Sequence, residues 1–281
     1  MLQPEAGHDP LMSLHPAVQD FVAAYLAGFD AEAPGLVEGL YLTGSAVLDD
    51  FHLGASDVDF VAVSRAAPTD REVAALRRAH DLLAARHPRP SVDGLYVTWQ
   101  DLAGNPLEAT PGPHINGGVF SPSNKAGRSP VTWHSLAHHG FAVRGPRPQE
   151  LKVWTDQGAL AEWTRDNLDS YWRRWWRRST CLLSKAGLAS LGGWAPAWGV
   201  LGVSRLHYTL ATGRITSKSG AGTYARATFN ARWHRIIDEC LRIRRGAFGP
   251  SLYGNPLSRR RDALAFMDVA IEDAHRVGGR E

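Results

Sequence analysis

The apolar residues of this sequence change their spacing about halfway along the chain. In the first half, stretches with helical spacing alternate with short apolar runs of the kind that form strands. In the second half, apolar residues recur at helical spacing alone. Alternating helices and strands form a sheet covered by helices, whereas successive helices pack on one another. The sequence therefore predicts an α/β domain with a small mixed sheet, followed by an all-helical bundle domain.

The first half predicts a domain over residues 1–148. Thr69 and Glu72 form a capping box, which fixes the start of one of its helices. The predicted helices cover residues 16–28, 70–86 and 130–139, and the predicted strands cover residues 39–43, 58–64, 92–99 and 141–145. Residues 104–128 are rich in Gly, Pro, Asn and Ser, so they predict a long loop that is either functional or disordered.

The second half predicts a helical domain over residues 149–281. Pro146 and Pro148 lie just before this boundary and are typical of a segment between domains. The predicted helices cover residues 155–185, 195–211, 223–245 with one break, and 257–277.

The composition is that of a globular intracellular protein. The chain has 281 residues, of which 44% are hydrophobic, so it can bury a sizeable core. Its net charge of +3 favours an anionic partner such as a nucleotide. Cys181 and Cys240 are expected to be free thiols buried in helices, as in a reducing cytosol. No apolar stretch approaches the roughly 20 residues of a membrane span, and the first ten residues lack a leader pattern. We expect a soluble, cytoplasmic protein.

A glycine, a serine and two aspartates form the pattern with the clearest chemistry. Gly44 ends a predicted strand, so the backbone can approach a phosphate closely there, and Ser45 adds a hydroxyl donor. Asp57 and Asp59 lie two residues apart at the next strand, so their side chains point to one face. Two carboxylates near such a turn are suited to holding the magnesium ions of phosphoryl chemistry.

Each part of this pattern has an ordinary structural interpretation. An isolated Gly-Ser pair is most often a turn, and an isolated Asp-x-Asp is usually a solvated strand end. The combination favours function, because Asp59 directly precedes the apolar run Phe60–Val63 and a carboxylate beside a buried strand needs a reason.

The same residues carry a resemblance to a known superfamily. Residues 41–47 (YLTGSAV) and 56–61 (SDVDFV) resemble the signature of the polymerase-beta-like nucleotidyltransferases. Residues 203–209 (VSRLHYT), 212–215 (TGRI) and 217–218 (SK) resemble the helical C-terminal domain of the streptomycin/spectinomycin adenylyltransferases. The resemblance extends from about residue 41 to the last helix.

The resemblance implies an enzyme that uses ATP and two Mg²⁺ ions to transfer AMP to a hydroxyl of an aminoglycoside, as in antibiotic resistance. It implies that Ser45 and Ser56 contact phosphate and that Asp57 and Asp59 hold the metals. A third carboxylate acts in such enzymes as general base or completes the metal site, and Asp93 is the best match. The two cations that grip the triphosphate match Arg205 and Lys218. The cleft between the domains is the expected active site.

The charge pattern departs from that of an aminoglycoside-binding protein. Residues 170–237 contain no Asp or Glu but 11 Lys or Arg, whereas an aminoglycoside is a polycation. A charge at about 4 Å is worth ~4 kcal/mol at an effective dielectric near 20, so such a wall disfavours a polycation. The predicted acceptor is therefore an aminoglycoside-like or another small molecule with a hydroxyl group.

Three alternatives remain. Residues 171–178 (YWRRWWRR) interleave aromatic and basic side chains, as a single-stranded nucleic acid platform would, although on a helix the tryptophans favour the core. His134 and His138 share a helical face, but the pattern offers no third zinc ligand. The chain is also compatible with a non-catalytic nucleotide-binding relative. Nucleic acid and membrane partners are not expected.

Overall fold

The structure, a computed structural model, describes residues 14–247 and 249–277. These residues divide into two compact units, which meet in the sequence between Trp154 and Thr155. The first ten residues, for which the sequence predicts no leader, lie outside the described part. None of the described helices is both long and apolar enough to cross a membrane.

The first unit continues past the boundary predicted at residues 148 and 149. A short 3₁₀ helix (η3, Pro148–Glu150) occupies that position. After it, Leu151, Val153 and Trp154 pack against the core of the first unit. The backbone N–H of Trp154 also donates to the carbonyl of Leu102 at 2.8 Å. The apolar side chains after the prolines therefore attach this segment to the first unit.

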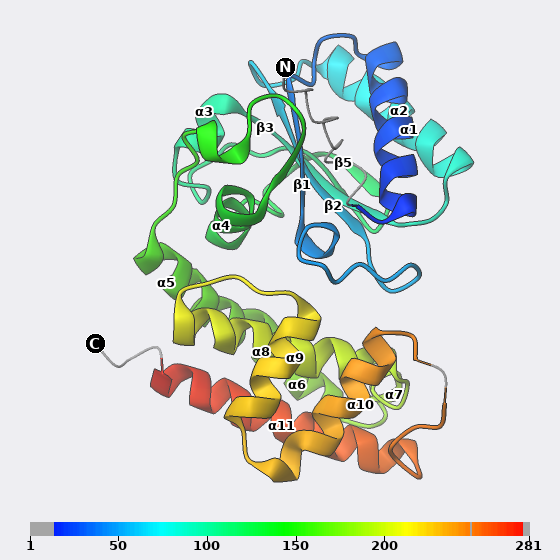
Figure 1. Cartoon of the computed structure of the whole chain (residues 1–281), viewed down its shortest axis with the longest axis vertical. Coiled ribbons are helices and arrows are strands. Elements are labelled where there is room, and N and C mark those ends of the chain that lie inside the picture. Colours follow the sequence, from blue (N-terminus) through cyan, green and yellow to red (C-terminus); the bar gives the residue numbers. More distant parts are fainter. Residues whose placement is uncertain (1–13, 248, 278–281) are drawn as a thin grey trace, which may run out of the picture. The chain divides into compact units, whose positions relative to one another are not determined.

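A six-stranded sheet forms the centre of the first unit (Figure 1). The strand order is β5-β4-β3-β2-β1-β6, in which β2 and β3 are parallel and every other neighbouring pair is antiparallel. The predicted mixed sheet is confirmed. The strands are β1 (Gly39–Thr43), β2 (Val58–Ser64), β3 (Val92–Thr98), β4 (Gly112–Asn116), β5 (Val119–Asn124) and β6 (Phe141–Arg144).

Helices cover both faces of this sheet. On one face, α1 (Pro16–Glu32) and α2 (Asp70–Arg86) bury a core with strand residues such as Phe60. On the other face, α3 (Trp99–Ala103) and α4 (Pro130–His139) bury a second core that contains Val61. Because neighbouring residues of a strand point to opposite faces, Asp59 lies on the same face as Val61. The sheet thus places Asp59 on the side of α3 and α4.

A buried polar network fixes β3 against α1 and α2. The hydroxyl groups of Tyr25 and Tyr96 are hydrogen bonded at 2.8 Å, and the Tyr96 hydroxyl is also 2.8 Å from Nε2 of His80. Burial lowers the pKa of His80 to about 3, so its imidazole is neutral at physiological pH. The network holds the middle of β3 in place, three residues beyond Asp93.

The prediction of a long loop over residues 104–128 is wrong, because this range contains the hairpin of β4 and β5. Asn116 pairs with Val119 across a two-residue turn, and both turn glycines have positive φ values, +55° at Gly117 and +77° at Gly118. Two glycines in succession suit such a turn, because neither carries a side chain that opposes positive φ. The Asn-Gly-Gly sequence was the signal for this hairpin.

The second unit is helical throughout its described residues, as predicted. Its elements are α5 (Gln157–Asn167), a π-helical turn η4 (Leu168–Trp172), α6 (Arg173–Thr180), α7 (Lys185–Ala189), α8 (Trp194–Thr212), α9 (Lys218–Thr228), the 3₁₀ helix η5 (Ala231–Trp233), α10 (His234–Arg244) and α11 (Pro256–Val277). Its core gathers apolar side chains from α8, α10 and α11, with α9 packed beside α8.

The single helix predicted over residues 155–185 is interrupted. It winds through the π-helical turn and stops at Cys181, whose backbone is extended with ψ 105°. The Ser184 hydroxyl then accepts from the backbone N–H of Gly187 and starts α7. Both cysteines are free, as predicted, but only Cys240 is buried; Cys181 is exposed because it follows the helix end.

The tryptophans of residues 171–178 pack inward. Trp172 is buried, with its ring 4.5 Å from that of Trp198 on α8. Trp176 donates from its indole N–H to the carbonyl of Leu264 at 2.8 Å. Arg174 and Arg177 are exposed, so the structural interpretation of this run is the one that the packing favours.

Candidate active site

A glycine turn ends β1 and begins the site. Gly44 has a φ of +63° and opens a short 3₁₀ helix, η2 (Gly44–Ala46). A Cβ atom on Gly44 would lie 2.0 Å from Oδ2 of Asp59, which no real side chain could do. Glycine is therefore required here on two grounds, the positive φ and the neighbouring carboxylate. The structure brings Gly44 and Asp59 into contact, and Ser45 follows directly in the same turn.

Three adjacent strands align the predicted carboxylates. Asp59 pairs with Thr43 of β1 on one side and with Asp93 of β3 on the other. Paired residues of neighbouring strands lie about 5 Å apart and point to the same face. Asp57 comes directly before β2 and is exposed, and it is separated from Asp59 by the buried Val58. The predicted common face of Asp57 and Asp59 stays a prediction, because Asp57 lies outside the strand.

Asp93 belongs to strand β3 and is not part of a turn. Its Oδ2 accepts from Nδ2 of Asn116 at 3.1 Å, and its Oδ1 accepts from the backbone N–H of Gly117 at 2.5 Å. Both donors come from the turn between β4 and β5. The next residue, Gly94, faces the ring of Phe60, where any Cβ would lie within 2.5 Å of ring atoms. The Asp93-Gly94 pair is thus fixed by sheet packing.

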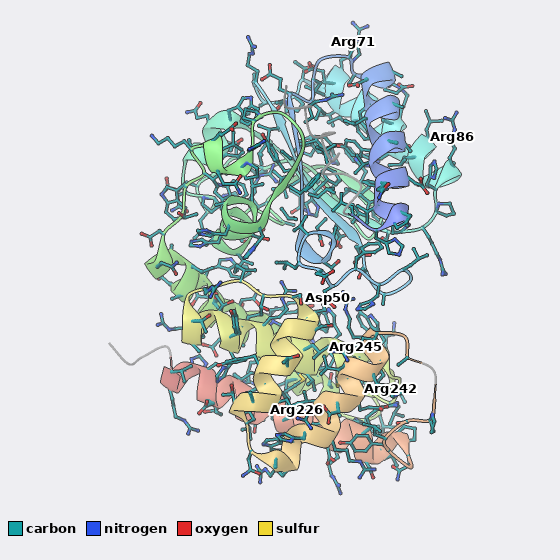
Figure 2. The ribbon with its side chains drawn as sticks, in the orientation of Figure 1. Asp50, Arg71, Arg86, Arg226, Arg242 and Arg245 are labelled. Atoms are coloured by element: carbon teal, nitrogen blue, oxygen red, sulfur yellow. The ribbon has the colours of Figure 1, made fainter. Side chains whose placement is uncertain are left out.

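The loop between η2 and β2 contains a buried carboxylate that the sequence analysis missed. Asp50, which is labelled in Figure 2, is 2% exposed. Its Oδ1 lies 3.1 Å from Nε2 of His52. Its backbone N–H donates to the carbonyl of Ser45 at 3.2 Å. Asp50 therefore links the Gly44 turn to the rest of the loop. The available signal was an Asp two residues before a His in a loop that joins two predicted site motifs.

Ser56 closes the same loop. Its hydroxyl accepts from the backbone N–H of His52 at 3.0 Å and lies 3.4 Å from the carbonyl of Asp50. The side chain is buried. In the structure this hydroxyl contacts loop backbone, and its predicted contact with phosphate stays a prediction.

The two predicted cations lie in the helical unit on neighbouring helices. Arg205 is half-buried in the middle of α8, and Lys218 is the first residue of α9, where Ser217 caps the helix through the N–H of Gly220. A helix N-terminus attracts anions, so a lysine there is unfavourable by itself and is consistent with an anionic partner.

A buried histidine connects the helices that carry these cations. His207 on α8 is fully buried, and its Nδ1 lies 2.9 Å from the hydroxyl of Tyr224 on α9. Its Nε2 lies 3.0 Å from Oδ2 of Asp273 on α11. With both ring nitrogens bonded, His207 fixes α8 against α9 and α11 and so limits where Arg205 and Lys218 can lie.

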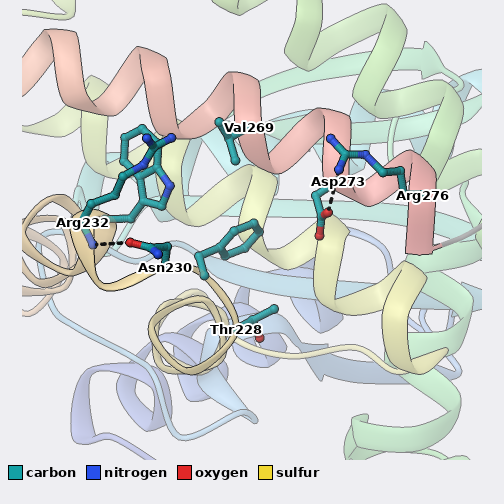
Figure 3. Close-up of a pocket in the computed structure, with 8 residues that line it drawn as sticks. Thr228, Asn230, Arg232, Val269, Asp273 and Arg276 are labelled. Carbon is teal, nitrogen blue, oxygen red and sulfur yellow. Dashed lines mark hydrogen bonds and ion pairs between the residues drawn. The ribbon is translucent and has the colours of Figure 1, made fainter.

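The helical unit also has a pocket of about 340 Å³ that the sequence analysis did not predict (Figure 3). Asp273 lines it, together with Arg276, whose Nη1 is 3.8 Å from Oδ1 of Asp273. The other lining residues are Thr228, Phe229, Asn230, Arg232, Trp233 and Val269.

The carboxylates do not form a ready metal cluster. Among the described residues there is no group of three or more His, Cys, Asp or Glu side chains that could hold a metal ion. Asp59 lies against Gly44, whereas Asp93 is bonded to the hairpin turn. The predicted metal site at Asp57, Asp59 and Asp93 stays a prediction. His134 and His138, with ring centres 5.6 Å apart, likewise belong to no such group.

Comparisons with known proteins find similarity in the fold and in part of the helical unit. Residues 184–256, which include Arg205 and Lys218, match the family model of the aminoglycoside adenylyltransferase C-terminal domain. The chain is similar in structure to spectinomycin adenyltransferase AAD(9) from Enterococcus faecialis, solved with ATP and spectinomycin. The TM-score is 0.65 at 12% identity, over 89% of this chain and 98% of that one.

None of the curated proteins compared matches the sequence significantly. The predicted resemblance is confirmed, since the chain is aminoglycoside adenylyltransferase-like in its fold and in its helical unit.

Proposed function

We propose that this protein is a Mg²⁺-dependent nucleotidyltransferase that transfers AMP from ATP to a hydroxyl group of a small-molecule acceptor. The observation that carries the proposal is the register of β1, β2 and β3, which aligns Asp59 with Asp93 beside the Gly44 turn. Like charges directly opposite each other on neighbouring strands are destabilising. The presence of both aspartates at one end of the sheet is explained if one of them binds a cation or accepts a proton.

The turn at Gly44 and Ser45 is proposed to bind the triphosphate. The absence of a Cβ at Gly44 makes room for the carboxylate of Asp59, a proposed metal ligand, beside the turn, and the half-buried Ser45 supplies a hydroxyl donor for a phosphate. Ser56 contributes in this proposal by closing the loop that leads from the turn to Asp57, with Asp50 as the buried anchor of that loop.

Asp57 and Asp59 are proposed to hold Mg²⁺. Their carboxylate oxygens are the donors that Mg²⁺ prefers, and this ion usually takes one or two protein carboxylates together with phosphate oxygens and water. The donor set therefore fits Mg²⁺ although the described residues offer no three-residue cluster. When bound, the ion would neutralise negative charge on the phosphates and on the departing pyrophosphate.

Asp93 is proposed as the general base. The acceptor hydroxyl gives its proton to a carboxylate oxygen of Asp93 as its own oxygen bonds to the α-phosphorus. The bond from that phosphorus to the bridging oxygen breaks, and pyrophosphate leaves with the electron pair. Arg205 and Lys218 are proposed to bind the negative charge of the triphosphate, as the family match over residues 184–256 suggests.

The acceptor is proposed to carry little positive charge. The similar adenyltransferase was solved with spectinomycin, but residues 170–237 of this chain contain 11 cations and no acid. Ion pairs neutralise part of this charge, since Arg173 binds Asp268 at 2.6 Å and also Glu272. The remaining excess favours ATP and opposes a polycationic aminoglycoside.

Calorimetry and a pyrophosphate-release assay test the proposal together. We expect MgATP to bind the wild-type chain, and pyrophosphate to appear when an acceptor is added. Spectinomycin, streptomycin and neutral sugars serve as acceptors, and the more highly charged streptomycin is expected to react least. Asp57→Asn should abolish release, whereas Asp81→Asn, an exposed change on α2, should not.

Two outcomes would redirect the proposal. MgATP binding without pyrophosphate release with any acceptor would favour the non-catalytic nucleotide-binding alternative. An Asp57→Asn variant that retains full release would remove the metal role assigned to this residue.

A further inference from the structure

The turn between β4 and β5 is anchored to the beginning of β3. Across the turn, Asn116 pairs with Val119, and the backbone N–H of Gly118 donates to the carbonyl of Val92 at 3.2 Å. Gly117 and Gly118 hold the positive φ values that a two-residue turn requires. The turn is exposed, yet these bonds fix its position relative to the strand that carries Asp93.

Both oxygens of the Asp93 carboxylate accept a hydrogen bond from this turn. Nδ2 of Asn116 donates to Oδ2 at 3.1 Å, and the backbone N–H of Gly117 donates to Oδ1 at 2.5 Å. Two donors on different oxygens fix the plane of a carboxylate, which otherwise rotates freely about its last torsion. Each oxygen has a second lone pair, so the bonds leave acceptor capacity for a substrate proton.

The two donors also stabilise negative charge where the sheet concentrates it. Asp59 is the in-register neighbour of Asp93, so two carboxylates meet at the same end of β2 and β3. Asp59 lies against Gly44, on the side of β2 that faces β1, whereas Asp93 is bonded to the hairpin on the opposite side of β3. The hairpin thereby gives Asp93 hydrogen-bond partners that differ from the surroundings of Asp59.

We infer that the β4–β5 turn is a positioning element, in which Asn116 and the Gly117 N–H hold Asp93 in place for the acceptor hydroxyl and outside the metal-binding pair. The inference rests on the proposed function and deepens it. Asn116 is a positioning residue, because it acts through Asp93 and its amide is already engaged there. Removal of its donor is expected to impair the transfer step without weakening the binding of ATP or metal.

Four variants of this hairpin test the inference. Asn116→Ala should lower kcat roughly tenfold or more, the usual cost of losing a partner that orients a functional group. Asn116→Asp keeps the shape of the side chain but replaces the donor by a second negative charge, so kcat should fall further than in Asn116→Ala. Asn116→Ser keeps a donor and should recover part of the activity. Asn124→Ala changes another exposed asparagine of the hairpin and should behave as wild type.

The measurements are pyrophosphate release from MgATP with spectinomycin or streptomycin, Mn²⁺ binding by electron paramagnetic resonance, and thermal unfolding. We expect reduced kcat with unchanged KM for ATP, unchanged Mn²⁺ affinity and an unchanged melting temperature for Asn116→Ala. Equal kcat in Asn116→Ala and wild type overturns the inference. A fall in Mn²⁺ affinity also overturns it, because Asp93 would then be a metal ligand.

The failure of the proposed function is recognisable separately. A wild-type chain that releases pyrophosphate with none of spectinomycin, streptomycin and the neutral sugars removes the proposed function and this inference with it. Normal wild-type release combined with normal release by Asn116→Ala and Asn116→Asp removes the inference alone.

Discussion

Glu239 of the helical unit and the aspartates of the candidate site in the first unit have opposite surroundings. In the helical unit, Glu239 is fully buried, and its oxygens accept from Arg242 at 2.8 and 3.0 Å, from the Ser251 hydroxyl at 2.6 Å and from the Leu252 N–H at 3.0 Å. Arg259 lies 3.4 Å away as a second counter-charge. This carboxylate has as many donors as it can use, and its role is to hold α10, the following segment and α11 together.

In the first unit, the sheet register places one carboxylate directly beside another. Asp59 and Asp93 are in-register neighbours on β2 and β3, and Asp57 lies just before β2 at the same end of the sheet. A carboxylate placed next to another carboxylate costs stability. Removing a carboxylate from a buried ion pair costs stability as well, because its cationic partners are left uncompensated. The contrast separates a structural acid from acids retained for chemistry. It also predicts opposite consequences when each is neutralised.

Neutralising Asp59 should have the largest effect on activity. Asp59→Asn removes the charge proposed to hold Mg²⁺, and we expect kcat/KM to fall roughly 10³-fold, the scale of losing a central electrostatic contact. The melting temperature should stay the same or rise, because repulsion from Asp93 is relieved. Pyrophosphate release and calorimetric unfolding measure the two properties. A strongly destabilised Asp59→Asn variant would show that Asp59, like Glu239, stabilises the fold.

Neutralising Glu239 should do the reverse. Glu239→Gln leaves two arginines without their counter-charge, and breaking a buried pair costs about 3 kcal/mol. Burial alone raises the pKa of Glu239, but its hydrogen-bond donors and the charge of Arg242 together outweigh burial and lower the pKa to about 2, from an ordinary value near 4.5. The stabilisation is therefore complete above about pH 4.5 and is lost as the pH falls from there towards 2.

Urea unfolding at pH 7 and pH 3 tests this prediction. The difference between wild type and Glu239→Gln should be large at pH 7 and smaller at pH 3. Glu162→Gln, an exposed change on α5 of the same unit, is the control and should leave stability unaltered. Equal stability of Glu239→Gln and wild type at pH 7 would contradict the role assigned to this carboxylate.

Gly44→Ala tests how closely the first unit's site is packed. The new Cβ would meet Oδ2 of Asp59 at 2.0 Å, and a left-handed φ costs about 1–2 kcal/mol for a residue other than glycine. A displacement of about 1 Å at a reacting group can lower the rate roughly 100-fold, which is the loss expected here. Gly54→Ala is a matched control, because Gly54 has a φ of +89° but no atom within 4 Å of the position that a Cβ would occupy. If both variants lose equal activity, backbone strain alone explains Gly44.

The sequence predicted best those parts of the first unit that depend on local patterns. The strands at residues 39–43 and 58–64 have the predicted bounds, because each is a largely apolar run that ends at a polar residue. The capping box at Thr69 and Glu72 fixes the start of α2 for the same local reason. With these strands located, their pairing brings Asp59 beside Gly44.

Features that depend on distant partners were missed. The β4–β5 hairpin has few apolar residues and gains its stability from pairing with β3, so its sequence alone resembles a loop. The buried Asp50 depends on a loop that closes through Ser45 and Ser56. In the helical unit, the end of α6 at Cys181 depends on a new helix start at Ser184 that periodicity does not detect. The resemblance of residues 203–218 to the adenylyltransferase helical domain was nevertheless recognised, because short motifs there carry more information than spacing, and these residues lie within the range 184–256 that the family model matches.

The smallest effect is expected at Lys218, where the helical unit is proposed to contribute a cation. Lys218→Ala should raise the KM for ATP roughly tenfold, since one hydrogen bond to a charged group is worth about 1.5 kcal/mol or more. Both kcat and stability should change little, because a lysine at a helix N-terminus is opposed by the helix dipole. Lys185→Ala is a close control, because Lys185 is also the first residue of a helix capped by a serine. Steady-state kinetics with varied ATP separates the two variants. An equal KM in both would show that the position of Lys218 at α9 has no part in nucleotide binding, and the contrast between the units would then rest on their carboxylates alone.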